Sequence, residues 1–98
     1  MDRDLELLES EHAYDIKKLL NEYKLKIGDQ KVGIKTYLDS NGYYQMETSH
    51  LYRGEGKAGV YTASAANFQS EYEALTFAKR QLLSFYDGQG EWFKNEMY

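Results

Sequence analysis

The sequence predicts an α+β fold in the order α-β-β-β-α, a three-stranded antiparallel meander with two helices packed on one face. Three observations support this prediction. Apolar residues recur at steps of three and four towards both ends of the chain, apolar and polar residues alternate in the middle, and glycine-containing turns separate the segments. Because 98 residues suit one domain, we expect a single domain over residues 1–98.

The first expected element is one long helix over residues 3–26. An apolar stripe follows helical spacing, acidic residues occupy the first turns, and lysines occupy the second half, as the helix dipole favours. Gly28 is expected to end this helix. His12 lies on the stripe, so we expect it to be a hydrogen-bonded core histidine. The stripe consists of Leu5, Leu8, His12, Ile16, Leu19 and Tyr23.

A three-stranded sheet is expected over residues 31–68. The first two strands alternate apolar and polar residues from Val32 onwards and again from Tyr44. A third strand is expected from Gly59 to about Phe68, and its many small side chains would let a helix approach the sheet closely.

The register of the first two strands follows from the turn between them. A three-residue loop at residues 40–42, with a left-handed glycine at its end, pairs Leu38 with Tyr44 and Lys35 with Glu47. A two-residue turn would instead mix apolar and charged side chains on one face. A slip of one residue reverses every side chain, so this agreement favours the three-residue loop.

A second helix is expected over residues 71–87. Ser70 and Glu73 form a capping box at its start, and Gly88 is the expected C-cap. The remaining residues, 88–98, form an aromatic tail. The tail contains Trp92, Phe93, Met97 and Tyr98.

Composition excludes several classes of protein. The absence of cysteine excludes thiol catalysis, disulfide frameworks and cysteine-bound zinc or iron–sulfur centres. The sequence contains no apolar run of about 18 residues and no signal peptide, so we expect a cytoplasmic protein that does not enter a membrane. We also expect no cofactor.

Charge bears on the class of partner. The 12 basic and 16 acidic residues give a net charge of −4, and residues 1–15 carry six acids against Arg3 alone, a balance of −5. Proteins that grip duplex nucleic acid neutralise phosphates with Lys and Arg, and this chain has no basic block. The acids therefore either solvate a helix face or form an acidic surface that meets a basic protein partner.

A glycine motif in the middle of the chain resembles a phosphate-binding loop. Gly54, Gly56 and Gly59 spell G-x-G-x-x-G, but the residues that follow predict a strand rather than the helix that a dinucleotide site requires. We expect a flexible hairpin connection here. Anion capture is the alternative, with Arg53 and Lys57 as the candidate contacts.

Catalytic and metal-binding groups are few. Ser49 and His50 are neighbours on an expected strand, so their side chains should point to opposite faces and cannot form a nucleophile–base pair. No histidine or carboxylate spacing typical of a metal site is present. We therefore expect no catalytic, cofactor-binding or metal-binding residues, and a protein that is not an enzyme.

The ten tyrosines point to an interaction surface. Three of them fall on the expected outer sheet face, where aromatic rings would act as anchors for a protein partner or a second copy of the chain. Two other interpretations remain: the C-terminal tail covers this face with Trp92 and Phe93, or single-stranded bases stack on it. The candidate interface residues are Tyr37, Tyr43, Tyr61, Lys35, Glu47, Trp92 and Phe93.

Two families share features with this chain. The α-β-β-β-α order over residues 3–87 resembles a double-stranded-RNA-binding domain, which implies RNA binding. Where that family carries a basic cluster, at the start of its second helix, this chain has Ser70-Glu71-Tyr72-Glu73. The stretch Glu73-Ala74-Leu75 with Ala78-Lys79 and Tyr86 is similar to a helix of HicB-type antitoxins.

From the residues we predict a small non-enzymatic protein-binding module that acts through an aromatic and acidic surface. In size and composition it resembles phage-encoded inhibitors of bacterial defence enzymes, which implies an inhibitor or regulator of a nucleic-acid-handling protein. The alternatives are a nucleic-acid- or nucleotide-binding module and a HicB-like antitoxin component.

Overall fold

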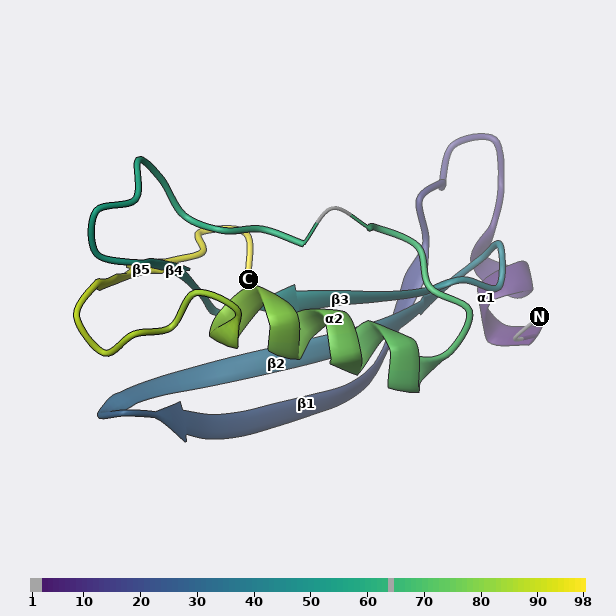
Figure 1. The fold of residues 1–98 in the computed structure, drawn as a ribbon. Helices are drawn as coiled ribbons and strands as arrows, with labels where there is room; N and C mark the ends of the chain where they lie inside the picture. Colours follow the sequence, from purple (N-terminus) through teal and green to yellow (C-terminus); the bar gives the residue numbers. More distant parts are fainter. Residues whose placement is uncertain (1–2, 64) are drawn as a thin grey trace.

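The computed structural model describes residues 3–63 and 65–98 of the chain. The elements follow the order α1 (Arg3–Leu8), β1 (Lys17–Ile27), β2 (Gln30–Asp39), β3 (Tyr44–Thr48), β4 (His50–Arg53), α2 (Glu71–Leu83) and β5 (Glu91–Lys94). The first three strands form an antiparallel sheet in chain order, and β4 pairs with β5 in a second sheet. Figure 1 shows α2 lying along the three-stranded sheet, with α1 at the end opposite the β1–β2 turn. The α+β class is therefore confirmed.

The long helix predicted over residues 3–26 is wrong. Only α1 is helical in this region, and it ends at Leu8, while Lys17–Ile27 form the first and longest strand, β1. Gly28 does not end a helix. With a φ of +61°, it occupies the first position of a two-residue turn that joins β1 to β2, where glycine is favoured because the backbone is left-handed.

The predicted element order is also wrong, because the third strand expected over residues 59–68 does not form. In the described part of this segment, only Phe68 pairs with a strand, in an isolated bridge to Tyr44. Ser64 lies outside the described residues. The third position in the sheet is taken by β1, which pairs along β2 on the side away from β3.

The register predicted for the other hairpin is confirmed. Leu38 lies opposite Tyr44, and Lys35 lies opposite Glu47. The connection is the three-residue loop at residues 40–42, whose last residue, Gly42, has a φ of +86°. Turn chemistry and alternation agree here, so local sequence determines the pairing.

The second helix starts as predicted and ends earlier. Ser70 is the N-cap, and its side chain accepts a hydrogen bond from the Glu73 backbone N–H at 3.1 Å. The helix stops at Leu83 rather than at residue 87. The tail expected at residues 88–98 contains β5, which lies against β4.

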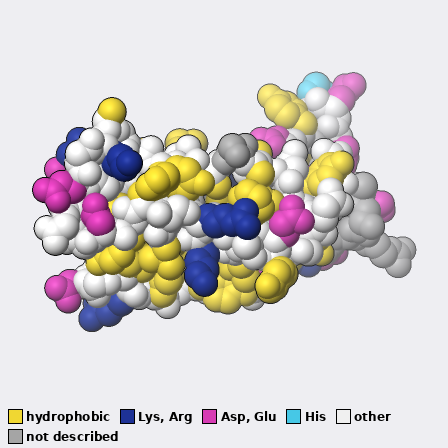
Figure 2. All heavy atoms as spheres, in the orientation of Figure 1, with side chains coloured by type: hydrophobic (Ala, Val, Ile, Leu, Met, Phe, Trp, Pro, Cys, Tyr) yellow, Lys and Arg dark blue, Asp and Glu magenta, His cyan; other side chains and the backbone are white. Residues whose placement is uncertain are grey.

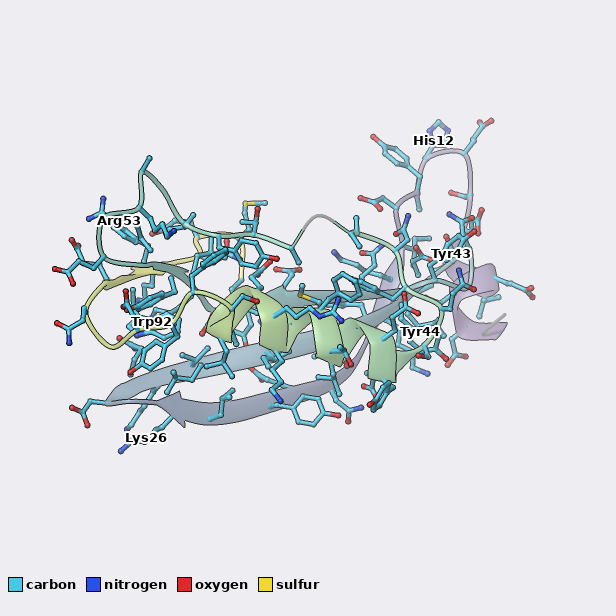
Figure 3. All side chains as sticks on the ribbon, in the orientation of Figure 1. His12, Lys26, Tyr43, Tyr44, Arg53 and Trp92 are labelled. Carbon is cyan, nitrogen blue, oxygen red and sulfur yellow. The ribbon has the colours of Figure 1, made fainter. Side chains whose placement is uncertain are left out.

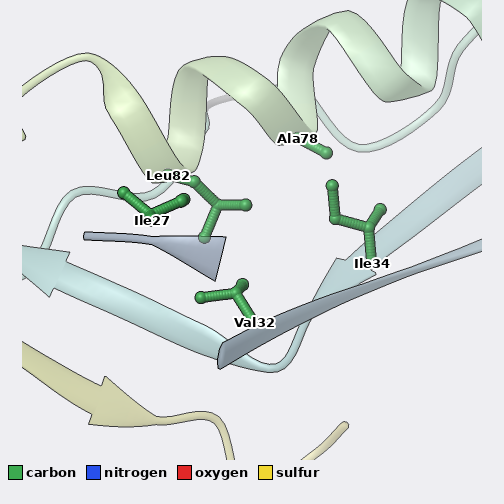
Figure 4. Packing of buried hydrophobic residues seen from close by; sticks show 5 residues of the cluster. All are labelled: Ile27, Val32, Ile34, Ala78 and Leu82. Atoms are coloured by element: carbon green, nitrogen blue, oxygen red, sulfur yellow. The ribbon is translucent and has the colours of Figure 1, made fainter. Parts of the chain in front are cut away.

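The core lies between α2 and one face of the three-stranded sheet. Ala78 and Leu82 of α2 pack against Val32 and Ile34 of β2 and against Ile27 (Figure 4). We call this the inner face of the sheet, and the opposite one the outer face. None of the described helices is long and apolar enough to cross a lipid bilayer.

Two buried threonines continue the inner face towards the other end of the sheet. The Thr36 hydroxyl donates to Glu71 Oε2 at 2.6 Å, and Asn21 Nδ2 donates to the same oxygen at 2.6 Å. These bonds lower the pKa of Glu71, with Thr36 as the larger cause. The Thr48 hydroxyl donates to the His50 carbonyl at 2.8 Å. The Glu71 carboxylate thus links the first turn of α2 to Asn21 of β1 and to Thr36 of β2.

Candidate interaction surfaces

The outer face carries a contacting group of charged and aromatic side chains. Lys17 Nζ lies 3.6 Å from Glu47 Oε1 and 4.6 Å from the centroid of the Tyr37 ring. Burial, followed by the negative charge of Glu47, raises the pKa of Tyr37. Three residues from three adjacent strands therefore meet on this face.

Tyr98 covers the next part of the outer face. The Tyr98 hydroxyl donates to Glu22 Oε2 at 2.8 Å, and the ring centroid lies 4.0 Å from Lys35 Nζ. The hydroxyl also rests on Gly33, where any side chain would overlap it. Burial, followed by the Glu22 carboxylate, raises the pKa of Tyr98. The tail does fold back onto the outer face, but it does so through Tyr98.

The route to this position runs through Asn95. The Asn95 backbone N–H donates to the Ser49 carbonyl at 2.8 Å, and its side-chain amide donates to the Thr48 carbonyl at 3.0 Å. The Tyr98 N–H then donates to the Asn95 carbonyl at 3.1 Å, which turns the chain towards Gly33.

The other candidate interface residues are distributed over separate places. Tyr43 lies between the loop at residues 40–42 and the start of β3, and its side chain is 39% exposed. Tyr61 packs edge-on against Phe85, with centroids 4.9 Å apart, away from the outer face. Trp92 packs against the core, and Figure 3 shows it between β5 and the three-stranded sheet. Phe93 lies beneath Arg53, 5.3 Å from ring centroid to guanidinium carbon. The predicted residues therefore do not form one surface.

A groove of about 830 Å³ lies beside Tyr98, towards the β1–β2 turn. Among the described residues, Lys24, Lys26 and Lys31 of this groove have no ion-pair partner for their ammonium groups. Lys26 lies directly opposite Lys31, so two like charges share a cross-strand pair. The groove is lined by Glu22, Lys24, Leu25, Lys26, Lys31, Val32, Gly33, Ser49 and Tyr98.

This basic groove was not predicted from the sequence. The signal that could have found it is the alternation of lysine with apolar residues in Tyr23-Lys24-Leu25-Lys26-Ile27, followed by Gly28-Asp29. That pattern is typical of a strand that enters a two-residue hairpin turn.

The loop that contains Gly54, Gly56 and Gly59 is hydrogen-bonded to a carboxylate of the same chain. Asp87 accepts hydrogen bonds from the Glu55 backbone N–H at 3.1 Å and from the Tyr52 hydroxyl. The bond from Tyr52 is the main cause that lowers the pKa of Asp87 to about 2. Arg53 pairs with Glu91 at 2.6 Å. The place that an anion would take beside this loop thus holds a carboxylate of the chain itself.

The second candidate anion contact is also engaged. Lys57 Nζ lies 5.2 Å from the centroid of the Phe85 ring. The chain makes a tight turn here, because the Lys57 N–H donates to the Gly54 carbonyl at 3.1 Å. Arg53 is therefore paired with a carboxylate, whereas Lys57 contacts an aromatic ring and no carboxylate of the described residues.

The expectation that Ser49 and His50 point to opposite faces is wrong. The chain bends between β3 and β4, and Ser49 Oγ lies 2.8 Å from His50 Nδ1. Gln30 Nε2 lies 3.4 Å from the other ring nitrogen, His50 Nε2. The Gly33 N–H donates to the same oxygen at 2.7 Å. Ser49 and His50 therefore lie side by side at the bend, with Gln30 and not a carboxylate next to the second ring nitrogen.

The N-terminal end of the molecule projects from the sheet. We call residues 4–15 the N-terminal projection; they comprise most of α1 and the loop after it. Leu7 is 84% exposed, Leu8 61% and Tyr14 80%, and acidic side chains surround them. Figure 2 shows hydrophobic and acidic side chains together at this end. The acidic residues are Asp4, Glu6, Glu9, Glu11 and Asp15.

His12 lies in this projection and not in the core. It is exposed at the tip of the loop, 3.2 Å from the Glu11 carboxylate, and Figure 3 shows it pointing away from the sheet. The helical stripe on which the buried position rested does not form, because the helix ends at Leu8.

Within residues 3–63 and 65–98, no three His, Cys, Asp or Glu side chains lie close enough together to hold a metal ion. No protein-family model, curated protein or solved structure matches the chain.

Proposed function

We propose that the protein is a small non-enzymatic protein-binding module whose N-terminal projection binds a basic surface on a nucleic-acid-handling protein and inhibits or regulates it. The observation that supports this proposal is the exposure of Leu7, Leu8 and Tyr14 among five acidic residues. Exposed apolar groups with a polar rim are typical of interaction sites. Acidic side chains add complementarity to a surface that otherwise binds phosphates.

The arrangement of the serine and histidine supports the absence of catalysis. The second ring nitrogen of His50 lies next to Gln30 and not next to the carboxylate that orients the base of a catalytic triad. If a His50→Ala variant that remains folded lost a measurable hydrolytic turnover present in the parent chain, the non-enzyme proposal would be overturned.

The binding proposal is tested by affinity capture with matched variants. The triple variant Leu7→Ser, Leu8→Ser, Tyr14→Ser removes the apolar groups of the projection. The control variant Tyr72→Ser, Met97→Ser removes two side chains that are equally exposed, at 82% and 84%, but lie elsewhere. We expect the triple variant to lose a partner that the parent and the control both retain.

The captured partner supplies the second part of the test. We expect addition of the parent chain to displace nucleic acid from that partner, measured by fluorescence anisotropy of a labelled oligonucleotide, and the triple variant to displace none. A partner that binds nucleic acid equally well with and without the chain would contradict the inhibitory role.

A nucleic-acid-binding module is the second candidate function. The unpaired Lys24, Lys26 and Lys31 favour it, because phosphates are held by lysine and arginine. The start of α2, which double-stranded-RNA-binding domains use to grip phosphates, instead carries Glu71 bound to Thr36. Anisotropy with labelled dT15 and with an RNA duplex at about 0.15 M salt decides between the candidates. Binding that Lys24→Glu abolishes would replace the protein-binding proposal.

A further inference from the structure

We infer that the free edge of β1 takes up an extended segment of another protein in which acidic and apolar residues alternate, as an added antiparallel strand. This surface is separate from the N-terminal projection, so the inference goes beyond the proposed function. It rests on the direction of main-chain groups, on unpaired charges and on exposed apolar side chains along one strand.

The first step concerns the main-chain groups of β1. Gly33 donates its N–H to Ser49 Oγ at 2.7 Å and accepts from the Ser49 N–H at 2.9 Å, so both of its groups point towards β3. Its partner across the ladder is Lys24. In an antiparallel ladder, two residues directly opposite each other either bond to each other through their main-chain groups or both point those groups away from each other. Lys24 therefore directs its N–H and C=O outward, to the edge of the sheet.

The same direction repeats along the strand. The ladder is regular from Asn21 to Ile27, so Glu22 and Lys26, two residues either side of Lys24, also point their main-chain groups outward. Among the described residues, β1 pairs with β2 alone. From Glu22 to Lys26 the strand thus presents a row of main-chain donors and acceptors that have no strand beside them.

The side chains define what an added strand would carry. On the outer face, an incoming residue opposite Lys24 or Lys26 would lie about 5 Å away between Cβ atoms, and acidic residues suit these unpaired ammonium groups. On the inner face, Tyr23 is 39% exposed and Leu25 is half-buried, so apolar residues suit that side. Successive residues of a strand alternate between faces, which gives an acidic–apolar alternation.

A second copy of the chain fits this edge less well. Lysines protect sheet edges from self-pairing, and β1 carries four of them against one glutamate. Two β1 strands side by side would therefore bring like charges together. Of these four, Lys24 and Lys26 have no acidic partner among the described residues, and they attract an acidic strand. The phosphates of a nucleic acid would pair with the ammonium groups, but they would form no strand-like hydrogen bonds with the outward N–H and C=O groups of β1.

The test uses a synthetic nine-residue peptide of alternating glutamate and valine. Two control peptides accompany it: one of the same composition with glutamates and valines in separate blocks, and one with lysine in place of glutamate. Amide hydrogen exchange of the full chain is followed by NMR with each peptide. We expect the alternating peptide alone to slow exchange of the Lys24 and Lys26 amides by about tenfold or more at saturation.

Matched variants locate the site. Lys24→Glu, Lys26→Glu reverses two charges at the edge, and Lys57→Glu, Lys79→Glu makes the same net change elsewhere. We expect the first pair to weaken binding about tenfold or more and the second to leave it within about twofold. Lys24→Pro removes an outward N–H without touching the β2 ladder, so it should abolish binding while the fold survives.

Several results would overturn the inference. These are no binding of the alternating peptide at about 1 mM, equal binding of the block peptide, displacement of the peptide by dT15, or a dimer of the free chain that Lys24→Pro dissociates. The triple variant of the N-terminal projection should still bind the peptide. Failure of the proposed function and failure of the edge site are therefore distinguishable.

Discussion

The hydroxyl of Tyr98 rests on Gly33, the outer-face position of β2 that has no side chain. The same hydroxyl donates to Glu22 on β1, and the ring covers Lys35. The missing side chain thus allows one tyrosine to bridge two strands from above. Tyr98 also forms one wall of the groove that contains the unpaired lysines.

The first prediction concerns this contact. Gly33→Ala should destabilise the protein by about 0.5–1.5 kcal/mol, because a methyl group would displace the Tyr98 hydroxyl and break its hydrogen bond to Glu22. The free energy of unfolding in urea measures the effect. Gly59→Ala is the matched control, since no atom lies within 4 Å of the added carbon there.

A double-mutant cycle separates this contact from a general preference of strands for alanine over glycine. In a Tyr98→Ala background, Gly33→Ala should cost little or should stabilise the strand. An equal cost in both backgrounds would show that Tyr98 is not the reason.

The second prediction concerns the carboxylate that fastens α2 to the sheet. Thr36 is fully buried, and its hydroxyl donates to Glu71. Thr36→Val should therefore lower the free energy of unfolding by about 1–3 kcal/mol, as expected for a lost hydrogen bond to a charged group. Thr62→Val, at an exposed position, serves as control. A neutral Thr36→Val would contradict the role given to this bond.

The third prediction concerns acid. The pKa of Asp87 falls from 3.8 to about 2 in the folded protein, mainly through the Tyr52 hydroxyl. A lowered pKa contributes stability above the unfolded value, and this contribution is lost as pH falls through the folded value. The free energy of unfolding should therefore decrease between about pH 5 and pH 2, and Asp87→Asn should reduce that decrease.

The fourth prediction distinguishes strand from helix in residues 17–27. Gly28 has a φ of +61°, and a Cβ there would also overlap the Tyr86 hydroxyl. Gly28→Ala should therefore destabilise the protein by about 1 kcal/mol or more. A glycine that ends a helix is also left-handed, so this cost by itself does not separate a strand from a helix. Backbone chemical shifts of residues 17–27 provide the second measurement, and helical values would contradict β1.

The sequence was sufficient where local chemistry specifies one structure. The loop that ends at Gly42 fixes the pairing of Leu38 with Tyr44, and Ser70 starts α2 by capping it. Each feature depends on residues within a few positions of one another. The α+β class follows from these elements, because a hairpin with one apolar face requires a helix to cover it.

The sequence was insufficient to predict the element where the apolar residues fit both the spacing of a helix and that of a strand. Leu19, Tyr23 and Ile27 stand four residues apart, as on a helix, while Tyr23, Leu25 and Ile27 also alternate, as on a strand. Pairing with β2 decides between them, and that pairing is a tertiary interaction that intrinsic preference does not reveal. The error in β1 then hid the basic groove, which exists only when Lys24 and Lys26 share a sheet face.

Long-range contacts explain the remaining differences at the candidate surfaces. Tyr61 packs on Phe85 and Trp92 packs on the core, each through a neighbour far away in the sequence. Tyr37 and Lys35 lie on the outer face as expected from alternation. The approach of Tyr98 to that face depends on Asn95 binding at Ser49, which no pattern near residue 98 indicates.

The pairing of β4 with β5 has a consequence for the order of folding. β1, β2 and β3 are joined by short turns, so their contacts close small loops and can form early. His50 and Lys94, by contrast, are partners across nearly half the chain. We expect Tyr98 to reach Gly33 only after that pairing has brought Asn95 to Ser49. We therefore expect the wall of the basic groove to be among the last parts of the molecule to assemble and among the first to open.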